Sequence, residues 1–95
     1  MPNLDYHNIK IEKYENTDQI VVRGEISNNS GRSYNAVAVR LVIFIKNIAI
    51  ANVVFTINGL LKGANREFEK IIDDLEYEQV AKDITRYEMY TESVY

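Results

Sequence analysis

The feature that most constrains this sequence is a long, mostly apolar segment with a polar break near its middle. The segment covers residues 37–57 and breaks at Lys46-Asn47. It is rich in β-branched residues, which favour extended strands. Asn47 can also take the positive φ that a tight hairpin requires. The pattern therefore predicts a β-hairpin that ends at Asn58-Gly59, with strands over 34–45 and 48–57.

Alternation of apolar and polar residues predicts further strands on both sides of this hairpin, over 7–14, 19–27 and 83–94. Gly24 lies inside the second of these, where it indicates a bulge or the close approach of a bulky neighbour. The region 64–82 has two interpretations. It is either an amphipathic helix, or a strand over 66–72 followed by a connection with a short helical turn. We favour the second.

The number and spacing of these strands predict an all-β fold. A chain of 95 residues has room for one hydrophobic core. Six or seven short strands in that length are typical of an immunoglobulin-like antiparallel β-sandwich. We therefore expect a single sandwich domain over residues 1–95, with a short helix near residues 73–82. A small barrel is the alternative.

One order of features connects this sequence to a known family. It consists of Val22-x-Gly24-x-Ile26-x-Asn28-x-Ser30, then Tyr34, Val37 and Val39, the apolar segment 41–45, and Ile57-x-x-Leu60-x-x-Gly63 with Phe68. This order resembles the FxLYD domain family of small immunoglobulin-like modules, although the name-giving motif at 41–45 is degenerate. The resemblance implies a non-catalytic, prokaryotic and often extracytoplasmic domain, part of or attached to a cell-envelope system. A plant desiccation-type sandwich is a related alternative.

Residues that catalysis or metal binding requires are scarce in this sequence. There is no cysteine, and the single histidine is His7. One imidazole without a thiolate makes no recognised zinc site, and no glycine-rich phosphate-binding motif is present. The acidic run over 73–78 lacks the glycine and the ligand series of a calcium loop. We therefore expect no catalytic residue, no metal site and no cofactor.

The charge distribution and the length of the apolar runs limit the kinds of partner that this chain can have. Residues 1–66 hold eight Lys and Arg against five Asp and Glu, whereas residues 67–95 hold three against nine. Nucleic-acid binding needs clustered basic residues, so we expect no nucleic-acid partner. The apolar run 41–45 is far shorter than the ~20 residues that span a bilayer, so we expect no membrane insertion by this segment. No signal peptide is visible at the N-terminus, and the compartment stays open.

The predicted hairpin contains a candidate interface. If Lys46-Asn47 is a two-residue turn, its register is fixed. One face then carries Arg40, Val42, Phe44, Ala49, Ala51, Val53 and Phe55. The opposite face is also apolar, although an antiparallel sheet normally presents one face to water. We expect one face to pack in the core. The other is covered by residues 64–82, is changed by a β-bulge that resets the register, or binds a second chain.

These observations predict a non-catalytic protein-interaction or accessory module whose partner is another protein or its own copy. The alternative is a small intracellular protein-binding domain that uses the apolar sheet face, for example as a homodimer. An enzyme is the third hypothesis, which a pocket with converging polar groups would support.

Overall fold

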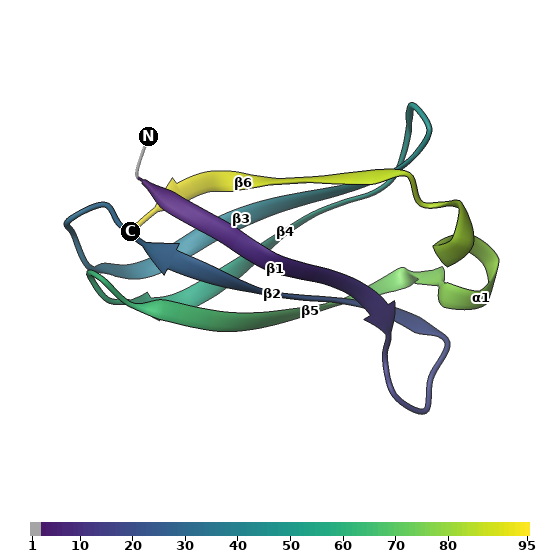
Figure 1. Ribbon diagram of the computed structural model, residues 1–95, viewed down its shortest axis with the longest axis horizontal. Helices are drawn as coiled ribbons and strands as arrows, with labels where there is room; N and C mark the ends of the chain where they lie inside the picture. Colours follow the sequence, from purple (N-terminus) through teal and green to yellow (C-terminus); the bar gives the residue numbers. More distant parts are fainter. Residues whose placement is uncertain (1–2) are drawn as a thin grey trace.

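The computed structural model describes residues 3–95, which form six β-strands and two short helical turns (Figure 1). In chain order the elements are β1 (Leu4–Lys13), β2 (Gln19–Asn28), β3 (Tyr34–Ile45), β4 (Ile48–Leu60), β5 (Asn65–Glu76), the helix α1 (Tyr77–Val80), a 3₁₀ turn (Ala81–Asp83) and β6 (Arg86–Val94). All pairings are antiparallel, in two sheets with the orders β1-β2-β5 and β4-β3-β6. The predicted all-β, immunoglobulin-like sandwich is confirmed, with six strands.

Side chains from both sheets fill the space between them as two hydrophobic clusters. The buried members of one are Ile20, Val22, Leu41, Ile43 and Ile72, and those of the other are Ile26, Val37, Val39, Ile57 and Leu60. Inward-facing residues of β2 and β3 supply most of both clusters, because these are the central strands of their sheets. Figure 1 shows β1 and β2 in front of β3 and β4, with α1 at one end of the molecule.

The region 64–82 is a strand followed by a short helical connection, as in the interpretation that we favour. β5 pairs with β2, placing Phe68 opposite Gly24 and Ile72 opposite Ile20. The helical interpretation is wrong, because pairing with β2 satisfies this backbone and buries Ile72 in the core. The expected end of β4 at Asn58-Gly59 is also wrong. Gly59 has a φ of 71° and the strand continues to Leu60, which is fully buried.

Gly24 marks the close approach of bulky neighbours. An added Cβ would collide with the side chain of Ile9 and would stand 2.8 Å from Cζ of Phe68. The Phe68 ring in turn packs against Phe55 of the opposite sheet, with ring centroids 5.6 Å apart. A side chain at position 24 would displace this aromatic pair, which connects the two sheets.

The β3–β4 hairpin departs from the predicted register. Residues 44 and 45 pair as predicted, but Ile43 pairs with Ala51, which leaves Ile50 as an extra residue in β4. Such a bulge moves the following residues to the opposite face of the strand. In the turn itself, the positive φ of 55° belongs to Lys46, and not to Asn47 as expected.

Asn28 is a buried polar residue that ties two loops together. Its backbone exchanges hydrogen bonds of 2.9 Å with residues 63 and 64 in the β4–β5 connection. Its side-chain amide donates to the carbonyl oxygens of Arg32 and Leu60, at 2.6 and 3.2 Å. Its side-chain oxygen accepts from the backbone N–H and the hydroxyl of Ser30. Both side-chain polar atoms therefore have partners, and they anchor the loop between β2 and β3.

Candidate functional site

The predicted interface does not lie on a single face. Beyond the bulge, Ala51, Val53 and Phe55 pair with the core residues 43, 41 and 39 of β3. All three side chains are half-buried and pack against the core clusters. The prediction that these three share a face with Arg40, Val42 and Phe44 is therefore wrong, because the extra residue in β4 reverses the alternation that the two-residue turn predicts. Of the three ways to resolve the second apolar face, the register-resetting bulge is present.

The other four predicted residues, Arg40, Val42, Phe44 and Ala49, lie on the outer face of sheet β4-β3-β6. The guanidinium of Arg40 forms two hydrogen bonds of 3.0 Å with the carboxylate of Glu92 and donates a third to Asn52. This pairing lowers the pKa of the Glu92 carboxyl and raises that of Arg40. Side chains of the chain itself therefore cover part of this face.

Phe44 and Val42 are covered in the same way. The guanidinium of Arg86 lies over the Phe44 ring, 3.7 Å from its centroid, and also pairs with Glu88. Only 7% of Val42 is exposed. The apolar side chains of Val42 and Phe44 on this face are therefore largely shielded from solvent.

β4 is an edge strand whose outer backbone is unpaired over most of its length. Within the described residues 3–95, the backbone of residues 48–57 makes no hydrogen bond apart from its ladder with β3. The last part of the edge is occupied, because the side chain of Arg66 donates to the carbonyl oxygens of Asn58 and Gly59, at 2.8 and 2.7 Å. The backbone N–H and C=O groups of residues 48–57 that point away from β3 are therefore free donors and acceptors.

The four edge strands differ sharply in charge. β4 has thirteen residues and none is Asp, Glu, Lys, Arg or His. In contrast, β5 carries seven charged residues among twelve, β1 carries four Asp, Glu or Lys residues, and β6 carries three charged residues. Charged side chains on an edge strand oppose its pairing with another chain. Three edges therefore have this protection and β4 lacks it.

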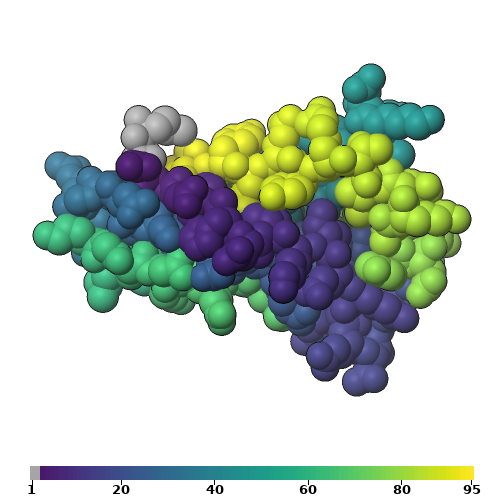
Figure 2. All heavy atoms as spheres, in the orientation of Figure 1, coloured from purple at the N-terminus to yellow at the C-terminus, as the bar shows by residue number. Residues whose placement is uncertain are grey.

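The side chains along β4 are mostly apolar as well. Ile48 and Val54 are 68% and 44% exposed. Ile50, Val53 and Phe55 are half-buried, and the core covers them incompletely because no strand follows β4 in its sheet. The turn before β4, which contains Lys46, projects from the molecule in Figure 2, where it is teal at the upper right. A strand added beside β4 would cover apolar surface as well as pair backbone groups.

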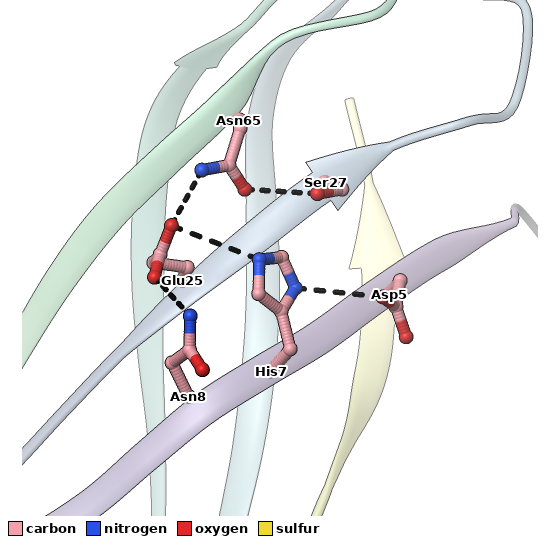
Figure 3. A network of polar contacts seen from close by, with 6 residues as sticks. All are labelled: Asp5, His7, Asn8, Glu25, Ser27 and Asn65. Carbon is pink, nitrogen blue, oxygen red and sulfur yellow. Dashed lines mark hydrogen bonds and ion pairs between the residues drawn. The ribbon is translucent and has the colours of Figure 1, made fainter.

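A second cluster of polar residues lies on the outer face of sheet β1-β2-β5. Figure 3 shows its members, Asp5, His7, Asn8, Glu25, Ser27 and Asn65, which come from all three strands. Glu25 is the centre. Its carboxylate accepts hydrogen bonds from the side-chain amides of Asn8 and Asn65. Both bonds lower the pKa of Glu25, and the bond from Asn8 has the larger effect. A carboxylate held by two amides is an ordered surface anion.

His7, which starts the strand predicted over 7–14, belongs to this cluster. Its Nε2 lies 3.7 Å from Oε1 of Glu25 and its Nδ1 lies 3.4 Å from Oδ2 of Asp5 (Figure 3). The Nδ1 atom is buried, yet among the described residues it has no partner in hydrogen-bond geometry. Neither this cluster nor any other group of His, Cys, Asp and Glu within residues 3–95 has the arrangement of a metal site.

A hollow of about 540 Å³ adjoins this cluster and shares Asn8 and Glu25 with it. Its other charged lining residues are Lys10, Glu12, Arg23, Glu67 and Glu69. Its central cation, Arg23, bonds to Glu69 at 2.9 Å and to Glu12 at 3.2 Å, and these bonds raise its pKa. Arg23 is therefore held by two carboxylates of the same chain, and the lining as a whole carries four carboxylates against two cations.

Comparison with solved proteins shows a similar fold. The chain is similar to a DUF1425 family member from Shewanella sp. pv-4, with a TM-score of 0.63 and 10% sequence identity. The match covers 97% of this chain and 79% of that chain. No protein-family model matches the chain, and no curated protein matches it. Among residues 3–95, no helix has the length and apolar character needed to cross a membrane. The likeness thus establishes an all-β sandwich shared with a DUF1425 protein.

Proposed function

We propose that this chain is a non-catalytic protein-interaction module that binds an extended polypeptide as an additional strand beside β4. The observation that carries the proposal is the edge over residues 48–57, which is unpaired in backbone and free of charge. Strand addition is a common mode of peptide recognition, in which main-chain hydrogen bonds provide the affinity and alternate side chains provide the selectivity.

The rest of the molecule supports a binding role more than a chemical one. Arg23, Arg40 and Arg86 are each paired with a carboxylate of the same chain. The ring nitrogens of the single histidine face the carboxylates of Asp5 and Glu25, and no hydrogen bond joins His7 to a hydroxyl among residues 3–95. The resemblance to the FxLYD family, proposed on sequence, agrees with a non-catalytic accessory module.

A peptide titration tests this function. The probe is a synthetic ten-residue peptide of alternating valine and threonine, with lysines placed outside the strand for solubility. The target is the full chain labelled with ¹⁵N, kept dilute while its amide resonances are recorded. We expect the amides of residues 48–57 to shift, and those of the charged edge strand β5 to stay in place. The matched control is the same peptide with lysine at its two central positions, which should bind much more weakly.

Two results would contradict the proposal. One is the absence of any shift when the peptide concentration reaches about 1 mM, because a complex with a dissociation constant weaker than this is not a specific one. The other is an equal response of β4 and β5, because the uncharged edge would then have no advantage over the charged one.

A further inference from the structure

We infer that the strand bound beside β4 is β4 of a second copy of this chain. This inference rests on the proposed function of that edge and names its partner. The pairing is antiparallel about a two-fold axis, so that the two sheets of order β4-β3-β6 become one continuous sheet across the dimer.

The charge pattern favours a copy of the same strand. Antiparallel self-pairing places residues of one strand opposite residues of the same strand, and like charges opposite each other are destabilising. An uncharged strand avoids this completely, whereas β5 with seven charged residues does not. An edge without charge also has nothing with which to select a foreign partner by electrostatic complementarity.

The dimer also buries the only uncharged edge strand among residues 3–95 in its interface. A two-fold interface uses the same surface on both copies, so pairing β4 with β4 hides both edges at once and closes the assembly. The edges that stay free are β1, β5 and β6, and each carries charged residues. The expected product is therefore a discrete dimer and not an open chain of subunits.

The side chains of β4 are compatible with such an axis near Val54. Pairing about this residue would place Asn52 opposite Thr56 of the second copy, and both side chains can hydrogen-bond. It would place Val53 opposite Phe55 of the second copy on the inner face, where both are half-buried in the monomer. The contacts of Arg66 with the carbonyls at 58 and 59 limit the paired length to the preceding residues.

The interface is small. A single pair of edge strands falls among the interfaces of less than about 1,200 Å², which are typically weak and transient. The measurement must therefore extend to high protein concentration, and we expect dissociation on dilution.

Sedimentation equilibrium of the full chain tests the inference with two matched variants. Val54 and Tyr90 both flank Arg40 on the outer face, from β4 and β6, and are 44% and 45% exposed. Lysine at either site adds the same charge beside the same arginine, but only Val54→Lys places it on the β4 edge. We expect the unmodified chain and Tyr90→Lys to approach twice the 11.0 kDa mass of one chain with increasing concentration. We expect Val54→Lys to stay at 11.0 kDa.

Several outcomes would overturn the inference. They are a monomeric unmodified chain at about 1 mM, a Val54→Lys variant that still dimerises, a Tyr90→Lys variant that also dissociates, and a polydisperse series of masses. Circular dichroism of each variant verifies that its sandwich is folded.

If the unmodified chain is monomeric but the valine-threonine peptide still binds at residues 48–57, the second copy is excluded as partner and the strand-binding function stands. If the peptide fails and the dimer forms, the binding of foreign strands is refuted and the edge pairs with its own copy alone.

Discussion

Replacing Asn28 with alanine tests how the two loops at one end of the sandwich are held. In the native fold its amide donates to the carbonyls of Arg32 and Leu60, and its oxygen accepts two bonds from Ser30. Alanine removes all four side-chain bonds. Leu60 is fully buried, so water cannot replace the lost donor at its carbonyl without opening the core.

The magnitude follows from the number of groups left without a partner. A buried polar group that loses its partner costs about 1–3 kcal/mol, and a partly exposed group costs less because water takes over the bond. One carbonyl falls in the first class, and the groups of the 30–32 loop fall in the second. We therefore expect Asn28→Ala to lower the free energy of unfolding by about 2–4 kcal/mol.

Urea denaturation, followed by circular dichroism or tyrosine fluorescence, measures this change. Asn29→Ala is the matched control, because the same residue type next in sequence is exposed and its side chain makes no hydrogen bond within the described residues. The control should change stability by less than about 0.5 kcal/mol. A decrease in the free energy of unfolding of less than about 1 kcal/mol for Asn28→Ala would refute the reasoning, because a buried carbonyl that loses its donor costs at least this much. An equal effect of the two substitutions would refute it as well.

Three further predictions concern the core and the titrating groups. Gly24→Ala should destabilise the fold by about 1–3 kcal/mol in urea denaturation, since its Cβ meets the Phe68 ring, and Phe68→Leu in that background should recover part of the loss. The pKa of Glu25 is lowered, so its stabilisation is complete above 4.5 and is lost as pH falls through the folded value. Glu25→Gln should therefore lose less stability in acid titration, and an unchanged acid limb would contradict this. Burial raises the pKa of Tyr6 against the opposing bond with Thr91. Its contribution is complete below 10 and is lost as pH rises through the folded value, so Tyr6→Phe should flatten the alkaline limb.

The strands and their sandwich arrangement could be predicted from sequence because alternation is a local signal. The residues of β2 that share one face are all buried, and the Gly24 position does face bulky neighbours. The register of the hairpin could not be predicted. Both alternating sets of side chains over 41–57 are apolar, so a slip of one residue exchanges two similar faces and the sequence pattern does not exclude the bulge at Ile50.

The roles of Asn28 and His7 could not be predicted for a different reason. The partners of Asn28 come from the 30–32 loop and from Leu60, which is 32 positions away in sequence. In the sequence Asn28 is only one polar position of the family pattern, although its side chain is fully buried in the folded chain. His7 gains Glu25 as a neighbour only because β1 and β2 pair. In both cases tertiary pairing supplies the contacts, and no local pattern marks them.

The lack of charged residues in β4 could be seen in the sequence, but the position of β4 at the edge of its sheet could not. The absence of charge from residues 48–60 is plain in the sequence, yet its meaning depends on β4 lying at the border of its sheet. The fold itself does not require this composition. Asn52, Val54 and Thr56 point outward and are exposed, so a lysine at Val54 would leave the core intact and should change stability by only about 0.5 kcal/mol. A charge that would protect the edge at so small a cost is absent, and this absence is consistent with an edge that pairs. If Val54→Lys instead destabilised the monomer by several kcal/mol, the core would account for the missing charge and the case for pairing would lose its main support.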